Sequence, residues 1–266
     1  MQVTRVQPFG YEVAGLDLRE DIGDAQVARL VELMNEQGFV LLRDQQLDAA
    51  QHARFARRFG PFSGHNQSDR EGLARRADGS FTLRMYDNRE GLGSVPELDF
   101  HSDNAHNPVS VRYLSLYGVD FGEGGERLAG GETMLANAAQ ALERLPAALR
   151  DRLDGLECHL AAQEHGSFAR PCIERHCETG RPYLIPSSLT QEIVGLGEDE
   201  FADVMGQIRA ALYSPAHVYR HHWREGDLIL WDNRLLHHAR AWFDTATKRI
   251  IRRCAIADVR EPTAIF

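Results

Sequence analysis

The chain has 266 residues, of which 43% are hydrophobic and 26% are charged, a composition typical of a globular protein with one large domain or two small ones. Its 30 Lys and Arg residues against 39 Asp and Glu residues give a formal net charge of −9 at pH 7, which argues against nucleic acid and anionic membrane surfaces as partners. No run of 18 apolar residues is free of charge, and the N-terminus has no apolar signal-peptide segment, so we expect neither a membrane span nor secretion.

The first sixty residues mix helical and strand-like patterns. Apolar residues recur at helical spacing from Asp24 to Gln37, and Gly38 is expected to end that helix. Phe39 to Leu42 form a short apolar run, which predicts a buried strand. A second helix is predicted over residues 48–58, with a turn at residues 59–62.

Strand-like patterns dominate the rest of the chain. Alternating residues from Val109 onwards predict a strand that has Val111, Tyr113, Ser115 and Tyr117 on one face and Leu114 and Leu116 on the other. The elements expected after it are a glycine-rich loop at residues 122–131, a helix at 138–153, and strands at 182–185, 227–231 and 249–258. Because no repeat or linker divides the chain, we expect one domain, residues 1–266, with a β-sandwich or barrel core and flanking helices.

His101 and Asp103 are separated by one residue, a spacing that two ligands of one metal ion can have. Residues i and i+2 of a strand point to the same side, so both side chains can reach one ion. A histidine from a distant strand would complete the set, and the candidates are His237 and His238, of which only one can face the ion. Two neutral nitrogens and one carboxylate leave coordination positions open, which suits non-haem Fe(II) that also binds a co-substrate and oxygen.

A second His-x-acid tripeptide is His176-Cys177-Glu178, which runs into Thr179-Gly180-Arg181-Pro182. The glycine and proline favour a turn, so we interpret this tripeptide as the tip of a hairpin. Together with Cys172 this tripeptide suggests a zinc site, but a structural zinc site needs two close ligand pairs and only one is present. The four cysteines show no CxxC spacing, which predicts reduced thiols in a cytoplasmic protein.

Several longer motifs follow one another along nearly the whole chain. Trp223 to His238 fits the pattern W-x-x-G-D-x-x-x-W-D-N-R-x-x-x-H. The other segments are Val40-Leu41-Leu42-Arg43-Asp44-Gln45, Phe55-Ala56-Arg57-Arg58-Phe59-Gly60, Gly130-Gly131-Glu132-Thr133, Gly180-Arg181-Pro182-Tyr183-Leu184 and Lys248-Arg249-Ile250-Ile251-Arg252-Arg253. In this order they resemble the taurine dioxygenase family of Fe(II)/2-oxoglutarate-dependent oxygenases. The resemblance implies a mainly β fold with flanking helices around a double-stranded β-helix (jelly-roll, cupin-like) core.

The resemblance also implies an iron centre. His101, Asp103 and His238, the histidine seven residues after Trp231, would be the iron ligands and so the catalytic centre. Asp232-Asn233-Arg234 would shape the turn before the ligand strand and would not bind the metal. Because Asp103 supplies the carboxylate that halogenating relatives lack, halogenation is disfavoured.

The same resemblance predicts a site for the co-substrate 2-oxoglutarate. Arg249 would pair with its distal carboxylate, for which a planar guanidinium is well suited, and the hydroxyl of Thr133 would help to hold it. Arg253 would lie near the oxoacid or the substrate. Without the resemblance, the two arginines could equally be solvated surface charges and Thr133 an ordinary strand-edge residue.

Predicted substrate contacts are His65, Glu97, Leu189 and Arg253. Family members that act on taurine are similar at His65, but they differ at Ser68, Glu97 and Leu189, so taurine is not the expected substrate. A carboxylate at Glu97 beside Arg253 would suit a molecule with both an ammonium and an acid group. The hypothesis is hydroxylation of an aliphatic carbon of a small amino acid or a compound derived from one, with O2 consumed and succinate and CO2 released.

We keep two alternative functions besides hydroxylation. The same cofactor chemistry can end in desaturation or oxidative decarboxylation, and a non-redox metal-binding isomerase, lyase or binding protein can use the same three ligands. Residues 64–97, which contain Gly91 and Gly93 and several charges, are predicted to form a lid loop over the substrate. The expected partner is a small molecule, and a homo-oligomer stays open.

Overall fold

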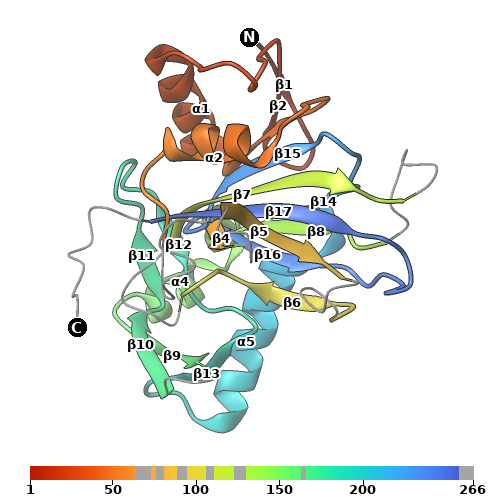
Figure 1. Cartoon of the computed structure of the whole chain (residues 1–266). Helices are drawn as coiled ribbons and strands as arrows, with labels where there is room; N and C mark the ends of the chain where they lie inside the picture. Colours follow the sequence, from red (N-terminus) through yellow and green to blue (C-terminus); the bar gives the residue numbers. More distant parts are fainter. Residues whose placement is uncertain are drawn as a thin grey trace.

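Two antiparallel sheets lie face to face in the computed structural model, which describes residues 1–63, 73–75, 81–88, 95–105, 111–122, 130–162 and 166–257 (Figure 1). The larger sheet has the strand order β1-β2-β3-β15-β7-β17-β5-β4 and the smaller has the order β14-β8-β16-β6. Side chains from both sheets line one cavity between them. The predicted mainly β fold with flanking helices is therefore confirmed, as a jelly-roll core.

The larger sheet contains strands from near both ends of the chain. Only β2 and β3 run parallel among its described neighbours, and the others are antiparallel. Its strands are β1 (Gln2–Arg5), β2 (Tyr11–Ala14), β3 (Phe39–Leu42), β15 (Leu228–Asp232), β7 (Val111–Asp120), β17 (Ile250–Ala257), β5 (Phe81–Asp87) and β4 (Leu73–Arg75). As predicted for β7, Leu114 and Leu116 line the cavity, whereas Tyr113 and Tyr117 belong to the core on the other side. The prediction is wrong for Val111, which belongs to the core cluster of Leu114 because the register with β17 shifts between Tyr113 and Val111.

The smaller sheet carries most of the predicted ligands. In its register His238 lies opposite His101 on one side and opposite Leu135 on the other. Its strands are β14 (Val218–His221), β8 (Thr133–Asn137), β16 (Leu236–Arg240) and β6 (Leu98–His101). Beyond it lie a three-stranded sheet of β9 (Glu157–Ala162), β10 (Gly166–Pro171) and β13 (Thr190–Ile193), and the hairpin of β11 (Ile173–Arg175) and β12 (Pro182–Leu184). The turn of that hairpin carries Cys177, so the hairpin interpretation is confirmed.

The two helices predicted in the first sixty residues cover the outer face of the larger sheet. They are α1 (Asp24–Gln37) and α2 (Ala49–Arg57), and Figure 1 shows both above that sheet. Asp48 caps α2, because its side chain accepts a hydrogen bond from the backbone of Gln51. Gly38 ends α1 at a φ of 94°, and a Cβ there would lie 2.6 Å from Leu236 Cδ2.

The prediction of one unbroken helix over residues 138–153 is wrong. The structure has two helices, α3 (Ala138–Arg144) and α4 (Ala147–Leu153), with an extended Leu145 between them. Pro146 explains the break, because a proline disfavours helical backbone at the residue before it. The sequence reading also missed α5 (Glu198–Tyr213), although Val204, Ile208 and Leu212 recur in it at helical spacing.

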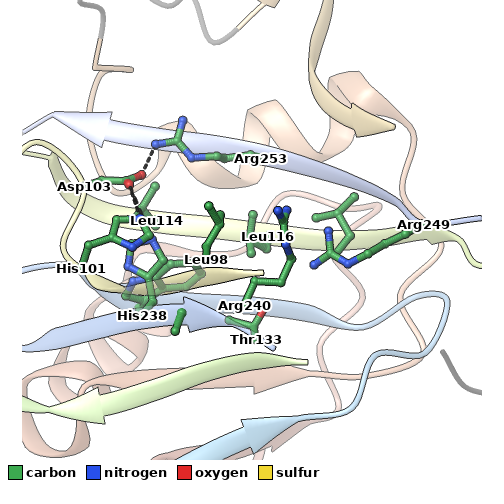
Figure 2. Close-up of a pocket in the computed structure, with 13 residues that line it drawn as sticks. Leu98, His101, Asp103, Leu114, Leu116, Thr133, His238, Arg240, Arg249 and Arg253 are labelled. Carbon is green, nitrogen blue, oxygen red and sulfur yellow. Dashed lines mark hydrogen bonds and ion pairs between the residues drawn. The ribbon is translucent and has the colours of Figure 1, made fainter. Parts of the chain in front are cut away.

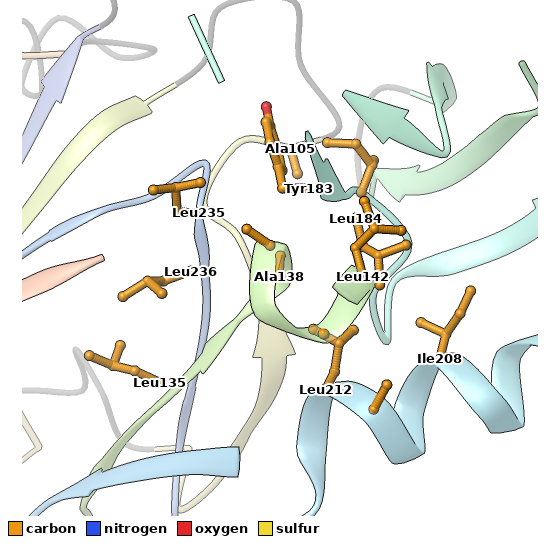
Figure 3. Close-up of a cluster of buried hydrophobic side chains, with 14 of the residues drawn as sticks. Ala105, Leu135, Ala138, Leu142, Tyr183, Leu184, Ile208, Leu212, Leu235 and Leu236 are labelled. Carbon is orange, nitrogen blue, oxygen red and sulfur yellow. The ribbon is translucent and has the colours of Figure 1, made fainter. Parts of the chain in front are cut away.

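The core on this side packs α3 and α5 against the smaller sheet. Figure 3 shows Leu142 of α3 near Ile208 and Leu212 of α5, with Leu236 of β16 on the other side of α3. Leu236, two residues before His238, thus holds the start of β16 in this apolar core. No helix in the described ranges is long and apolar enough to cross a membrane.

Part of the predicted lid segment is strand. Within residues 64–97, β4 and β5 pair with each other, and β5 pairs with β17 at the edge of the larger sheet. Residues 64–72, 76–80 and 89–94 lie outside the described residues. The segment is therefore not a loop throughout, and its role as a lid stays a prediction.

Candidate active site

The three predicted iron ligands converge at one end of the cavity. His101 ends β6, Asp103 follows it in a turn, and His238 lies on β16. The Nε2 atoms of both histidines lie 3.5 Å from Asp103 Oδ1. Among the described residues this is the group of three possible metal ligands whose donor atoms all lie within 4.8 Å of one another.

Neighbouring groups orient these ligands for a metal. His101 Nδ1 lies 2.7 Å from the carbonyl oxygen of Asp99, so Nδ1–H can donate there and leave the Nε2 lone pair facing Asp103. Burial, together with the adjacent His101 ring, lowers the pKa of His238 to about 4, so His238 is neutral at pH 7. His237 points to the opposite face, where its Nδ1 lies 2.8 Å from Tyr213 Oη. The choice of His238 over His237 thus agrees with the geometry.

Asp103 is ionised and fixed in place. Burial opposes its charge, but the guanidinium of Arg253 and the two histidine rings outweigh burial and hold the pKa of Asp103 well below its usual range. Its backbone N–H donates to Asn233 Oδ1 at 3.0 Å, and its carbonyl accepts from Asn233 Nδ2 at 2.9 Å. Asn233 was not predicted to act on a ligand, and only the fold brings it to Asp103.

Asp232 serves the turn and not the metal, as expected. Its Oδ1 accepts hydrogen bonds from the backbone of Arg234 and Leu235. Its Oδ2 lies 3.0 Å from His176 Nε2 and 3.3 Å from Arg112 Nη2. These contacts also engage His176, which leaves no support for the zinc alternative at the hairpin.

The cavity extends from this metal end towards two buried arginines (Figure 2). It has a volume of about 110 Å³, and its described lining is more apolar than polar. The lining consists of Leu98, His101, Asp103, Leu114, Leu116, Thr133, Trp231, His238, Ala239, Arg240, Arg249, Ile251 and Arg253. A triad that can hold a metal and basic groups that can hold an anion therefore share one cavity.

Arg249 has the properties of an anion-binding residue. It is 5% exposed, its Nε has no hydrogen-bond partner, and its Nη2 donates to the carbonyl of Gly131 at 3.4 Å. Burial, with the charge of Arg240 nearby, lowers the pKa of Arg249 to about 9. A buried guanidinium with so few acceptors is costly unless an anion pairs with it, so this end of the cavity fits a carboxylate.

Thr133 lies at the same end and can donate to that carboxylate. Its Oγ1 accepts a hydrogen bond from Trp223 Nε1 at 3.1 Å, which leaves the hydroxyl hydrogen for another acceptor. The donor set therefore fits 2-oxoglutarate, whose distal carboxylate would meet Arg249 and Thr133.

Arg253 lies at the metal end. Ile251 and Arg253 of β17 line the cavity, as does Arg249 just before this strand. The two arginines therefore point into the same space. The guanidinium of Arg253 donates to Asp103 Oδ2 (Figure 2). It is thus placed beside the metal ligand and apart from Arg249.

The predicted substrate contacts are not brought together. His65 lies outside the described residues. Glu97 is exposed and does not line the cavity, which Leu98 does instead, and Leu189 is half-buried away from it. The structure therefore gives no pairing of Glu97 with Arg253.

Arg240 lines the cavity but was not predicted from the sequence. The signal was available, because Arg240 stands two residues after His238 on the same strand and alternate residues share a face. Its Nη2 donates to the carbonyl of Val95.

Comparison with known proteins supports this description. The (S)-phenoxypropionate/alpha-ketoglutarate-dioxygenase of Sphingobium herbicidovorans is 29% identical over 97% of this chain and 95% of its own length. The alpha-ketoglutarate-dependent 2,4-dichlorophenoxyacetate dioxygenase of Cupriavidus pinatubonensis is 27% identical over 94% of this chain and 95% of its own length. A solved taurine dioxygenase from Burkholderia xenovorans superposes with a TM-score of 0.79 at 24% identity, covering 96% of this chain and 90% of that one.

These relatives are oxidoreductases that depend on alpha-ketoglutarate, which is 2-oxoglutarate, so the non-redox alternative is not supported. The family described as "Taurine catabolism dioxygenase TauD, TfdA family" matches residues 2–255. This chain belongs to that family of dioxygenases, whose cofactors are Fe(II), 2-oxoglutarate and O2.

Proposed function

We propose that this dioxygenase hydroxylates an aliphatic carbon of a small anionic molecule, a class that includes amino acids and compounds derived from them. The observation that carries the proposal is the shared cavity, with the His101, Asp103 and His238 triad at one end and the buried Arg249 at the other. This spacing of a metal site and a carboxylate site supports binding of 2-oxoglutarate between them.

The residues of the chain hold and orient the reactants. Bound Fe(II), 2-oxoglutarate and O2 supply the oxidising chemistry, with release of succinate and CO2. His101, Asp103 and His238 would hold the metal on one face and leave the other positions open. Arg249 and Thr133 would fix the far end of the oxoacid, and Leu114, Leu116 and Ile251 would exclude water from the cavity.

An acid group on the substrate is supported by two observations. The described lining carries Arg253 next to the metal end, and the names of two relatives specify 2,4-dichlorophenoxyacetate and phenoxypropionate, both carboxylates. An ammonium group has less support, because Glu97, which was expected to bind it, is exposed and outside the lining. We therefore propose a carboxylate with an apolar body as the substrate class.

The test is anaerobic addition of Fe(II) and then 2-oxoglutarate to metal-free protein, followed by visible spectroscopy. A weak metal-to-ligand charge-transfer band should form in the wild type, disappear in His238→Ala and weaken in Arg249→Ala. His237→Gln is the matched control, because His237 faces away from the cavity, and it should retain the band.

Absence of the band in the wild type would contradict the proposal. If the band forms, small carboxylates are screened for succinate release and the product mass is measured. An added oxygen atom supports hydroxylation, whereas loss of two hydrogens or of CO2 from the substrate indicates desaturation or oxidative decarboxylation.

A further inference from the structure

We propose that Arg240 is a second binding residue for the distal carboxylate of the oxoacid, and that with Arg249 it makes this end of the cavity selective for a dicarboxylic oxoacid. The inference rests on the proposed function, because it assigns a further residue to the same co-substrate site. The inference has two requirements. First, Arg240 must lie beside the groups that hold this carboxylate. Second, the net charge at this end of the cavity must be positive, so that an anion is attracted.

The position of Arg240 meets the first requirement. In the register of the smaller sheet, Arg240 on β16 lies directly opposite Thr133 on β8. Opposed residues of an antiparallel pair have Cβ atoms about 4.5–5.5 Å apart on one face, and both side chains line the cavity. Arg240 thus stands next to the hydroxyl that would hold the oxoacid.

The aromatic ring of Phe243 relates Arg240 to Arg249. The guanidinium carbons of Arg240 and Arg249 each lie 5.5 Å from the centroid of this ring. Both arginines are buried, with 7% and 5% of their surface exposed. Figure 2 shows their side chains at the end of the cavity away from the histidine ligands.

The charge of this end meets the second requirement. Two buried guanidinium groups repel each other and lose hydration, which destabilises the empty site. Among the described lining residues the one carboxylate is Asp103, and it pairs with Arg253 at the metal end. A carboxylate that enters next to Thr133 would relieve the repulsion and accept charge-assisted hydrogen bonds.

Selectivity follows from the cost of leaving Arg249, whose buried Nε has no hydrogen-bond partner, without a carboxylate. A monocarboxylic oxoacid such as 2-oxobutyrate binds the metal end as 2-oxoglutarate does, but it brings no distal carboxylate to Arg240 and Arg249. Sites built to bind a polar group discriminate strongly against an analogue that lacks it.

A purely structural role is the competing explanation. On that explanation Arg240, which donates to the carbonyl of Val95, only holds the chain before β6. In that case its replacement would affect every oxoacid equally, so comparing two oxoacids separates the two roles.

The experiment measures binding of 2-oxoglutarate and of 2-oxobutyrate to Mn(II)-loaded protein by calorimetry under anaerobic conditions. Arg240→Gln should weaken binding of 2-oxoglutarate about ten- to a hundredfold and leave binding of 2-oxobutyrate nearly unchanged. Arg240→Lys, which keeps the charge but not the planar fork, should show a smaller loss and serves if the glutamine variant does not fold.

The matched control is Arg252→Gln. Arg252 is buried like Arg240, but it lies on β17 and donates to the carbonyl of Leu47 on the other side of the larger sheet. Binding of both oxoacids should therefore stay as in the wild type. Unchanged binding of 2-oxoglutarate in Arg240→Gln, or an equal loss for both oxoacids, would overturn the assignment of Arg240. A wild type that binds no 2-oxoglutarate would instead overturn the proposed function itself.

Discussion

Asn233 holds Asp103 by its backbone, on both the N–H and the carbonyl. Because a ligand held by such contacts does not have to be ordered when the metal binds, Asn233 supports metal affinity without touching the metal. The next residue, Asn104, has a left-handed φ of 56°, so the turn that carries Asp103 contains a conformation that few non-glycine residues adopt.

We expect Asn233→Ala to weaken Mn(II) binding about 10- to 100-fold, the loss typical of groups that position ligands. Calorimetric titration of metal-free protein measures it. Asn35→Ala is the control, because Asn35 bonds to Glu178 and not to a ligand, and its affinity should be that of the wild type. Equal affinities in all three proteins would show that Asn233 does not position Asp103.

His52 shows how a buried titratable residue makes stability depend on pH. Its Nε2 lies 2.8 Å from Ser115 Oγ in the core under α2, and burial, with the charge of Arg252, lowers the pKa of His52 to about 3. The unfolded chain titrates near 6.5. Between these values the unfolded state binds a proton that the folded state does not, so the free energy of unfolding falls as pH decreases.

In His52→Gln this contribution is absent. The loss of unfolding free energy between pH 7 and pH 5 should therefore be smaller than in the wild type by about 2 kcal/mol. Urea unfolding at both pH values measures it, with His217→Gln, a histidine outside the core, as the control. Parallel pH dependence in wild type and His52→Gln would contradict the explanation.

At the scale of elements, the end of α1 is packed against the strand that carries His238. Gly38 adopts a left-handed φ and leaves room for Leu236, which starts β16 two residues before His238. A side chain at residue 38 would push on this strand as well as strain the turn. The helix end and the metal site are therefore coupled through one close contact.

We expect Gly38→Ala to lower the free energy of unfolding more than Gly195→Ala does. Gly195 also has a left-handed φ, of 88°, but a Cβ there meets nothing within 4 Å, so it reports the backbone strain alone. The difference should be about 1–3 kcal/mol, the usual cost of overpacking, as measured by urea unfolding. Equal losses would mean that Leu236 moves aside without cost.

At the scale of the whole molecule, the site joins the two sheets. The two candidate histidine ligands belong to β6 and β16 of the smaller sheet, and Arg249 stands immediately before β17 of the larger one. A metal with a bound oxoacid would bridge the sheets, and a ligand that binds only the folded protein stabilises it by mass action.

Mn(II) together with N-oxalylglycine, an inert analogue of 2-oxoglutarate, should raise the free energy of unfolding by about 2.7 kcal/mol when the analogue is at 100 times its Kd. Thermal unfolding measures the shift, and removal of the metal with EDTA should reverse it. Arg249→Ala should retain the shift caused by Mn(II) alone and lose the further shift caused by N-oxalylglycine. A full shift in this variant would contradict the role of Arg249.

Much of this protein was predictable from its sequence, and the reason is local. The i and i+2 spacing of His101 and Asp103, the alternation in β7 and β17 and the ends of α1 and α2 follow from short-range backbone geometry, and the ordered motifs indicated the family and its jelly-roll core. The helical pattern over residues 138–153 misled because one residue, Pro146, breaks the helix between α3 and α4. In α5 the helical spacing is present in the sequence, although no helix was predicted there.

Only the tertiary structure decided which residues meet. Cross-strand register places Arg240 opposite Thr133, the turn after β15 brings Asn233 to Asp103, and the start of β6 leaves Glu97 exposed beside the cavity-lining Leu98. Such contacts join segments about 100 residues or more apart, and they depend on how the sheets pair and stack. The sequence by itself therefore determined the family, the ligand candidates and the chemistry, whereas the packing of the two sheets determined the charge and the walls of the site.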